Sequence, residues 1–311
     1  MVITGGSRGL GLAMARRFAD EGARLVLMAR SADQLRTAAS ELDSRGAPVL
    51  TIACDVRERA QVAAAMDTAV RTFGRIDVLV NNAGVIQVTP FVHATLPDFE
   101  NSLATHLWAP LYTTNAALPH LVHTQGRIVN IASVGGRVAI PHMAPYCVGK
   151  FALVGLSEAL RAELSPYGVS VTTVSPFLMR TGSHRNVAVR GQHRKEAALF
   201  ALGTASGLTA MSADRAAGQI VHAARARRSH VSPGWPSRLA ALGQGLAPEL
   251  VSGIASLVTR LALPAPSRQA DGNEARDSRQ IDMGRLARAF ASDAALKYNQ
   301  RLAKDEVRPL T

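Results

Sequence analysis

Short apolar runs alternate along this chain with longer stretches in which apolar residues recur every three or four positions. A short run opens the chain at residues 1–4, and five runs of strand length follow, over 23–29, 48–54, 75–80, 126–132 and 169–174. Stretches rich in Ala and Leu lie between them, for example over 59–73, 98–122 and 147–165. This alternation predicts an α/β fold, a Rossmann-type doubly wound parallel sheet in three α/β/α layers.

A glycine-rich stretch, TGGSRGLG, spans residues 4–11 at the end of the first apolar run. Leu10, Met14 and Phe18 recur at four-residue spacing, which places them on one helix face for packing on a sheet. Glycines let the backbone approach a pyrophosphate closely, and the N-terminus of the following helix supplies N–H donors. Because ligands of a doubly wound sheet bind at the carboxyl ends of its strands, we expect a nucleotide here.

The glycine-rich stretch resembles the T-G-x-x-x-G-x-G signature of the short-chain dehydrogenase/reductase family. Four further features follow in that family's order and spacing: NNAG at 81–84, Ser133, YCVGK at 146–150 and SPFLMRT at 175–181. The resemblance covers residues 1–182 and extends more loosely to about 235, so we assign residues 1–235 to a catalytic domain. It implies hydride transfer between a nicotinamide cofactor and a small-molecule carbonyl or alcohol, in a homodimer or homotetramer.

The residues after the second strand indicate which nicotinamide cofactor binds. A site for NAD places a carboxylate there to accept hydrogen bonds from the ribose 2′-hydroxyl, whereas this chain has Met28, Ala29 and Arg30. Arg30 on one side and Arg8 on the other would hold a 2′-phosphate through charge-assisted hydrogen bonds. The alternative is that both arginines only decorate the surface. We predict NADP(H) as the cofactor.

The resemblance implies further cofactor contacts in the glycine-rich stretch, after the third and fourth strands, and in the last motif. They are Gly5, Ser7, Gly9, Leu10, Gly11, Asp55, Val56, Asn82, Ala83, Gly84, Pro176 and Thr181, together with Tyr146 and Lys150. Asp55 and Val56 resemble the family's contact to the adenine edge, and Thr181 matches the residue that touches the carboxamide. No metal site is expected.

Tyr146 and Lys150 stand four residues apart at the start of a helix, so they share one face. A free phenol has a pKa of about 10, and a nearby ammonium with an oxidised nicotinamide is expected to lower it. Tyr146 would then exchange a proton with the substrate oxygen, and the Ser133 hydroxyl would orient that oxygen. By resemblance, Lys150 also binds the nicotinamide ribose. A Tyr–Lys pair alone is common on helix surfaces. The position of Ser133, thirteen residues before Tyr146 as in the family, is what favours catalysis.

Two residues depart from the family pattern. His106 stands where the family has an Asn that helps to hold a water in a proton relay to the Lys. An imidazole donates and accepts hydrogen bonds, so His106 is either a relay residue or a packing residue. Phe177 stands where the family usually has a Gly after Pro176, and we expect it to reshape the pocket near the nicotinamide.

The chain beyond the resemblance has two apolar helical stripes within residues 232–264. One consists of Leu250, Ile254, Leu257, Val258 and Leu261, and the other of Leu239, Leu242 and Leu246. We expect residues 236–264 to form a lid over the substrate pocket or to pack on a second subunit, with peripheral contact to a membrane surface as the alternative. Prolines, Glu249 and Arg260 interrupt the run, which argues against a membrane span. Residues 265–311 are expected to form a linker and a short helix over about 283–303.

Composition adds little to this picture except through charge. Residues 183–311 contain 19 Lys and Arg against 10 Asp and Glu, which gives +9 of the chain's total of +12. Without a nucleic-acid-binding motif this charge favours a solvated surface over nucleic acid. Two cysteines suggest no disulfide framework, and because a fold motif already occupies the first residues no signal peptide is expected, so a cytoplasmic location is expected.

The apolar C-terminal segment suggests a hydrophobic substrate. A rival interpretation is an NADP(H)-binding protein without turnover that uses its basic C-terminal helices to bind a membrane or a protein partner, and His106 and Phe177 keep it open.

Overall fold

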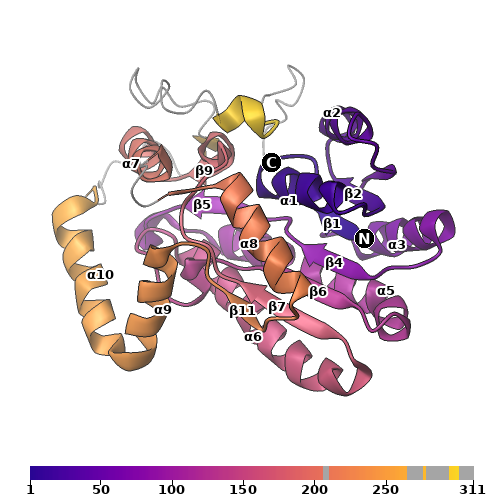
Figure 1. Ribbon diagram of the computed structural model, residues 1–311. Coiled ribbons are helices and arrows are strands. Elements are labelled where there is room, and N and C mark those ends of the chain that lie inside the picture. Colours follow the sequence, from indigo (N-terminus) through magenta and orange to yellow (C-terminus); the bar gives the residue numbers. More distant parts are fainter. Residues whose placement is uncertain (206–209, 265–275, 278–293, 301–311) are drawn as a thin grey trace.

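The computed structural model describes residues 1–205, 210–264, 276–277 and 294–300 of the chain. Its centre is a seven-stranded parallel sheet with the strand order β11-β7-β6-β4-β1-β2-β3 (Figure 1). The strands are β1 (Val2–Thr4), β2 (Leu25–Ala29), β3 (Val49–Ala53), β4 (Val78–Asn81), β6 (Arg127–Ile131), β7 (Ser170–Val174) and β11 (His230–Val231). The order reverses between β1 and β4, where a doubly wound sheet binds its ligand. The predicted fold is confirmed.

Helices cover both faces of this sheet. One layer packs into a core with Leu12, Leu27 and Val129 and the other into a core with Val26, Leu79 and Ile128. The first layer contains α1 (Gly9–Asp20), α2 (Ala32–Asp43) and α8 (Ala213–Arg225); the second contains α3 (Arg59–Phe73), α5 (Ala109–His123) and α6 (Ala144–Leu164). Alternate residues of each strand therefore face opposite cores, as in a sheet that is buried on both sides.

Helix α1 packs on the sheet with the apolar face that the sequence predicts. Leu10, Met14 and Phe18 are all buried in the core shared with α2 and α8. The helix has no side-chain cap at its N-terminus, where Arg8 is extended. Its first N–H groups are therefore available to another acceptor.

The stretch predicted as one helix over 98–122 is divided into three parts. Helix α4 (Leu96–Leu103) begins with a capping box between Thr95 and Asp98, and a π-helical turn over Ala104–Trp108 joins it to α5. Pro110, at the start of α5, has no N–H and cannot donate to the carbonyl of His106 four residues earlier. The missing bond explains the local widening of the helix at His106.

A smaller sheet was not predicted from the sequence. Strand β5 (Ile86–Val88) pairs in parallel with β9 (Val187–Val189), which also pairs with β12 (Arg276–Asp277). The next element is α7 (His193–Ala205). An ion pair and a hydrogen bond hold this region on the domain: Arg190 Nε lies 2.9 Å from Asp98 Oδ2, and His142 Nδ1 lies 2.8 Å from Glu196 Oε1. These contacts hold β9 and α7 at the carboxyl edge of the main sheet.

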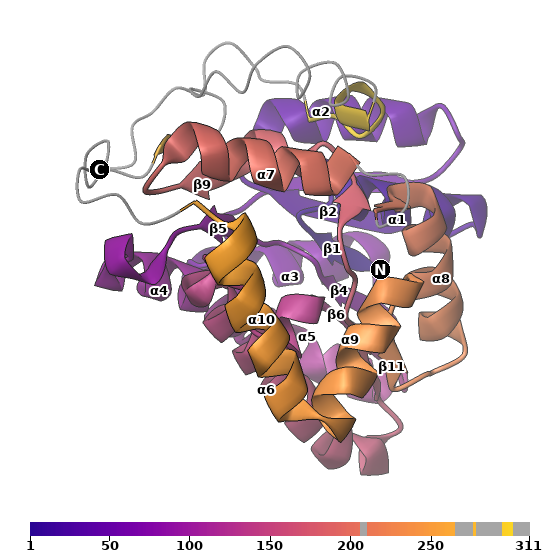
Figure 2. The same cartoon turned by 90° about the vertical axis from the view of Figure 1, so that its left-hand side faces the viewer.

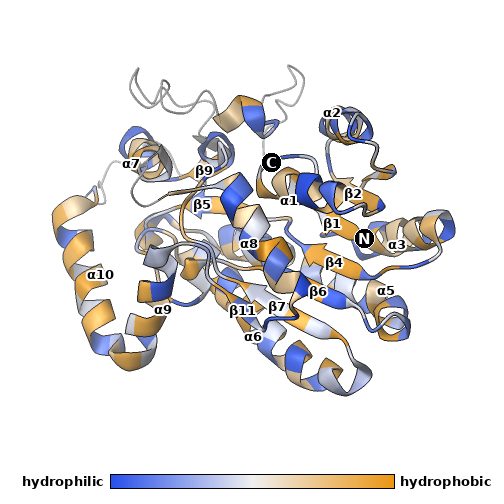
Figure 3. Cartoon of the chain, viewed as in Figure 1, coloured by the Kyte–Doolittle hydropathy of each residue, from blue (hydrophilic) through white to orange (hydrophobic). Residues whose placement is uncertain are grey.

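The two apolar stripes form a helical hairpin at one side of the molecule (Figures 1 and 2). Helix α9 (Trp235–Leu246) is anchored by the buried Ser237 hydroxyl, which donates to the Ser175 carbonyl, and α10 (Pro248–Ala262) packs against α9. All eight predicted stripe residues are 44–84% exposed, and the outward side of α10 is apolar in Figure 3. The stripe side chains are therefore largely solvent-exposed, and the expectation of a lid or an interface with a second subunit stays a prediction.

Among the described residues, no helix is both long enough and apolar enough to cross a membrane. The expected linker lies outside the described residues apart from 276–277, and so does most of the expected last helix. Of the latter, residues 294–300 are described, and 294–297 are helical.

Candidate active site

The glycine-rich stretch forms a tight loop between β1 and α1. Gly5 and Gly9 have φ values of +63° and +58°, which favour glycine. A Cβ on Gly11 would lie 2.1 Å from the Gly5 carbonyl oxygen, so the helix packs on the loop only because the side chain is absent. The loop thus presents backbone and the N-terminus of α1 at the carboxyl edge of the sheet, a fit to a dinucleotide pyrophosphate.

The NNAG motif fixes this loop from the neighbouring strand. The Thr4 hydroxyl accepts hydrogen bonds from the N–H groups of Asn82 (2.9 Å) and Ala83 (3.0 Å), and the Asn82 amide donates to the carbonyls of Thr4 (3.0 Å) and Gly5 (3.1 Å). Asn82 and Ala83, predicted as cofactor contacts, therefore hold the glycine loop in its shape. The sequence analysis missed Thr4, although a hydroxyl residue at the end of an apolar strand is a pattern that can indicate such a contact.

Ser133, Tyr146 and Lys150 are brought together from β6 and α6. Ser133 follows β6, and its hydroxyl accepts from the Gly135 N–H at 3.1 Å. Lys150 is buried, its ammonium donates to the Ile131 carbonyl at 2.8 Å, and its Nζ lies 5.8 Å from the centroid of the Tyr146 ring. Phenol, hydroxyl and ammonium thus lie at the end of β6, on the same edge as the loop.

The pKa of the Tyr146 phenol is raised, whereas the sequence analysis expects a nearby ammonium and an oxidised nicotinamide to lower it. Part of the Tyr146 side chain remains solvent-accessible, yet burial raises its pKa to about 12, only partly offset by a hydrogen bond with Ser133. Burial also lowers the pKa of Lys150 to about 7. The protein alone therefore keeps Tyr146 as a neutral phenol, the form that donates a proton.

His106 lies at the bottom of this site and is 1% exposed. Its Nε2 accepts from the Val85 N–H at 3.3 Å, and its Nδ1 lies 3.2 Å from the Ser102 hydroxyl oxygen. Its ring packs edge-on against the Tyr146 ring, with 5.6 Å between the ring centroids. Burial and then the charge of Lys150 hold the pKa of His106 well below its usual value. A neutral imidazole with a contact at each ring nitrogen supports the packing role. Separately, Pro110 has no N–H, so the backbone carbonyl of His106 lacks the donor that a regular α-helix would supply.

At the predicted adenosine end, Asp55 and Arg8 each pair with a residue that the sequence analysis did not consider, namely Arg57 and Asn186. Burial acts to raise the pKa of Asp55, but hydrogen bonds and charge from Arg57, with a smaller effect of Arg30, leave it below its usual value. Arg57 Nη2 lies 2.6 Å from Asp55 Oδ2, and Arg30 is exposed at the end of β2. Arg8 Nη1 donates to the Asn186 side-chain oxygen at 2.9 Å. Arg57 was missed by the sequence analysis.

The last predicted motif lies beside Ser133 and the glycine loop. The Pro176 carbonyl accepts from the Val134 N–H at 2.9 Å, next to Ser133, and Thr181 is buried. A Cβ on Gly9 would lie 4.0 Å from Thr181 Cβ, which joins this motif to the loop. Phe177 is partly exposed. The predicted residues therefore surround one edge of the sheet from Arg30 to Thr181.

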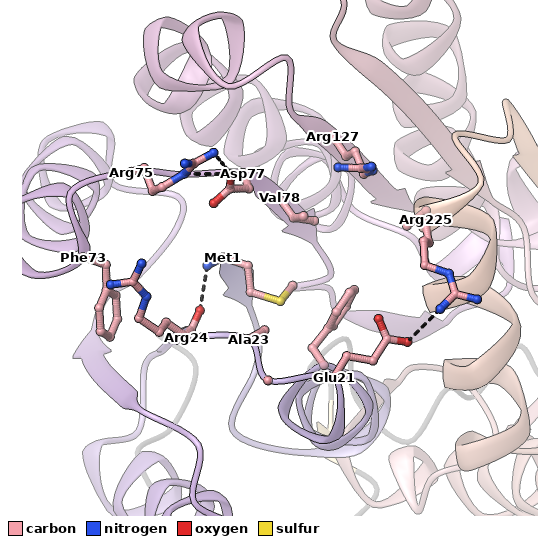
Figure 4. A pocket seen from close by; sticks show the side chains of 13 residues that line it. Met1, Glu21, Ala23, Arg24, Phe73, Arg75, Asp77, Val78, Arg127 and Arg225 are labelled. Carbon is pink, nitrogen blue, oxygen red and sulfur yellow. Dashed lines mark hydrogen bonds and ion pairs between the residues drawn. The ribbon is translucent and has the colours of Figure 1, made fainter.

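A cavity of about 390 Å³ lies at the other edge, among Met1, Arg24, Asp77, Arg127 and Arg225 (Figure 4). The Met1 amino group donates to the Arg24 carbonyl at 2.7 Å, and Arg75 pairs with Asp77 at the start of β4. None of the predicted site residues lines this cavity. The predicted site residues lie instead at the carboxyl edge.

Comparisons with known proteins show the family of this chain. The family profile described as short chain dehydrogenase matches residues 1–190. The D-threitol dehydrogenase of Mycolicibacterium smegmatis is 36% identical over 58% of this chain and 70% of its own length. The 11-beta-hydroxysteroid dehydrogenase-like 4A of Arabidopsis thaliana is 36% identical over 59% of this chain but 62% of its own length.

Two solved structures are similar over a larger part of the chain. A short-chain dehydrogenase from Streptomyces avermitilis has a TM-score of 0.69 at 25% identity, over 83% of this chain and 95% of that one. A metagenomic short-chain oxidoreductase in complex with NADP has a TM-score of 0.60 at 29% identity, over 75% and 96%. These findings support an oxidoreductase and NADP(H) binding, as predicted.

The packing of His106 makes Gly149 a sensitive position. A Cβ on Gly149 would lie 2.5 Å from the Ser102 hydroxyl oxygen and 2.8 Å from His106 Nδ1, whereas one on Gly155, in the same helix, meets nothing within 4 Å. We expect Gly149→Ala to lower the free energy of unfolding by about 1–3 kcal/mol through overpacking. Gly155→Ala should be neutral or stabilising by about 0.5–1 kcal/mol.

Urea unfolding of the two variants beside the parent checks this prediction. Equal midpoints for both variants would contradict the tight contact between α6 and His106.

Proposed function

Because the chain belongs to the short-chain dehydrogenase family, we propose that it is an NADP(H)-dependent carbonyl reductase or alcohol dehydrogenase. The observation that carries the proposal is the assembly of Ser133, Tyr146 and Lys150 beside a glycine loop whose helix N-terminus faces the same edge. Structural needs alone do not require a phenol, a hydroxyl and a buried ammonium together. The bound nicotinamide would supply or accept the hydride.

In the reductive direction, Tyr146 gives its phenolic proton to the substrate oxygen while the carbonyl carbon receives the hydride. The raised pKa of Tyr146 keeps the proton in place until the oxygen becomes basic. The Ser133 hydroxyl would orient the same oxygen, and Lys150, held on the Ile131 carbonyl, would contact the ribose and restore the proton. The backbone carbonyl of His106 is the acceptor that would hold a water in that relay.

The surroundings of Tyr146 favour a hydrophobic substrate. Apolar side chains of β5, β9, α7 and the start of α6 with the loop before it form one cluster with the Tyr146 ring, and its members include Ile86, Val88, Ile140, Met143, Val187, Val189 and Phe200. Ile86, Ile140 and Phe200 keep part of their surface exposed, and the apolar body of a carbonyl compound would bury that surface at about 25 cal/mol per Å² of apolar area. This cluster is a stronger argument for substrate class than the C-terminal hairpin.

The same domain has exposed apolar side chains on its helices. Trp108, Val148 and Phe151, on the π-helical turn and α6, are 43–48% exposed and support a homodimer or homotetramer. The stripes on α9 and α10 provide a further apolar surface for a second subunit or, in the rival interpretation, for a membrane surface.

The first experiment follows NADPH oxidation with a panel of hydrophobic ketones and aldehydes, with NADH as a control. We expect turnover that prefers NADPH, and a loss of about 10²–10⁴-fold in kcat for Tyr146→Phe, because the proton donor is removed. Tyr167→Phe, at a surface position that is 57% exposed, is the matched control and should keep full activity.

Tight NADPH binding without turnover on any substrate would instead support the non-catalytic interpretation. In that case His106→Asn is the next variant, because it restores the residue that the family has there.

The two directions should respond differently to pH. A phenol with a pKa of about 12 stays protonated through the working range, so reduction needs no titration of Tyr146, whereas oxidation needs its phenolate. Lys150, with a pKa of about 7, loses its charge as pH rises. We expect alcohol oxidation to rise steadily from pH 6 to 10 and carbonyl reduction to be fastest below about pH 7. Initial rates in both directions test this, and a reduction rate that increases with pH would contradict it.

The hairpin is tested by a variant with Leu250→Gln and Leu257→Gln, whose parent side chains are 64% and 55% exposed. If α10 packs on a second subunit, light scattering should show a smaller assembly and NADPH binding should persist. If α10 lies on a membrane, the assembly should be unchanged and sedimentation with anionic vesicles should fall. No change in either measurement would exclude both roles for this surface.

A further inference from the structure

The segment Ala294–Gln300 lies on the glycine-rich loop, although it is almost 290 residues away along the chain. Gly9 N–H, the first of α1, donates to the Tyr298 carbonyl at 2.8 Å. A helix N-terminus at this position is where the pyrophosphate of a dinucleotide is expected to bind. A backbone carbonyl of the chain itself therefore takes the donor that a phosphate oxygen would use.

The side chain of Gln300 fills the space above the same glycine. Its Nε2 lies 2.9 Å from the position that a Cβ on Gly9 would take, and the residue is 6% exposed. A glycine at this point of the loop leaves room for a ligand to approach the backbone. That room is taken by Gln300.

The segment runs along the whole length expected for the cofactor. At the adenosine end, the Asn299 amide donates to the carbonyls of Ser7 (3.0 Å) and Gln34 (3.2 Å), the latter in α2. At the other end, Ala295 is fully buried against Gly182, next to Thr181. The segment and an extended dinucleotide thus need the same path across the carboxyl edge.

The segment is a well-packed element in this arrangement. Tyr298 is 3% exposed, with the Arg16 guanidinium 5.6 Å from its ring centroid, and Arg16 also donates to the Lys297 carbonyl at 2.7 Å. Asn299 ends the short helix with φ at +53°, a conformation that Asn accepts more readily than most residues. Both the preference of Asn299 for this conformation and the packing of Tyr298 favour the same turn, in which the Tyr298 carbonyl points toward the N-terminus of α1.

We propose that residues 294–300 occupy the cofactor site as an internal competitor of NADP(H), so that the cofactor binds only after this segment has left. The inference rests on the proposed function, because it takes the glycine loop as the dinucleotide site. It adds regulation to that site: the chain binds NADP(H) from a minor, open state. Apparent affinity is then reduced by the fraction of molecules that are open.

The segment also reaches the residues that cover the substrate side. Gln300 Oε1 accepts from the Asn186 amide at 2.6 Å, and Asn186 in turn accepts from Arg8. Arg8 is the residue predicted to hold the 2′-phosphate, and Asn186 precedes β9 of the small sheet. Departure of the segment removes this bridge, which couples opening of the cofactor site to the substrate side.

The test compares NADPH affinities of the full chain, a chain ending at residue 293 and a chain ending at residue 300. NADPH fluorescence titration gives the dissociation constants. We expect the chain ending at 293 to bind at least roughly tenfold more tightly than the full chain, because an open fraction of about one tenth or less no longer limits binding. The chain ending at 300 keeps the segment and should bind like the full chain.

Point variants keep the test independent of truncation. Gln300→Ala empties the space above Gly9, and Asn299→Gly removes the amide while it tolerates the positive φ; both should tighten NADPH binding. Leu296→Ala changes a side chain of the same segment that is 47% exposed and should leave binding unchanged. Hydrogen exchange of the full chain should become faster at 294–300 when NADPH is added.

Equal affinities of the full chain and the chain ending at 293 would overturn the inference. Weaker binding by the shorter chain, with slower exchange at 294–300, would also overturn it and would make the segment a wall of the bound cofactor. Absence of NADPH binding in every variant would overturn the cofactor assignment and this inference together, so the two failures are distinguishable.

Discussion

The hydroxyl of Thr4 is the interaction on which the whole site depends. It lies at the end of β1, where the strand order reverses, and accepts from the backbone of Asn82 and Ala83 after β4, while the Asn82 amide returns two bonds to the glycine loop. The crevice of a doubly wound sheet opens between these two strands. Because the turns after both strands are cross-linked, the loop is held in shape before any ligand binds.

Buried hydrogen bonds extend this order to the proposed catalytic residues. Asn81 donates to the Asn130 side chain at 2.9 Å, and Asn130 donates to the Ser157 hydroxyl at 2.9 Å, so that β4, β6 and α6 are joined through the interior. Helix α6 carries Tyr146 and Lys150, and Lys150 is tied to β6 through the Ile131 carbonyl. Breaking one such bond leaves a buried polar group without its partner, which costs about 1–3 kcal/mol.

The parts of this structure that local patterns specify are the ones that the sequence predicts well. The strands of the main sheet, the buried face of Leu10, Met14 and Phe18, and the helical spacing of Tyr146 and Lys150 follow from periodicity and motif order. The π-helical turn at His106 depends on one missing donor at Pro110, so a helical period alone does not reveal it. The pairing of β5 with β9 and the docking of Tyr298 on Gly9 join residues about 100 and 289 positions apart. No local pattern encodes such contacts, which depend on the folded domain.

The chemistry of this chain and the access to it come from different parts of the sequence. The family match ends at residue 190, and the proposed catalytic residues and the glycine loop all lie within it. Most of the cover lies beyond it: Glu196 secures α7 on the substrate side, and Tyr298, Asn299 and Gln300 lie over the cofactor side. Asn186 touches both covers through Arg8 and Gln300. If NADP(H) displaces residues 294–300 as proposed, the contacts of Asn186 and Arg8 change with it, which would link access of the cofactor to access of the substrate.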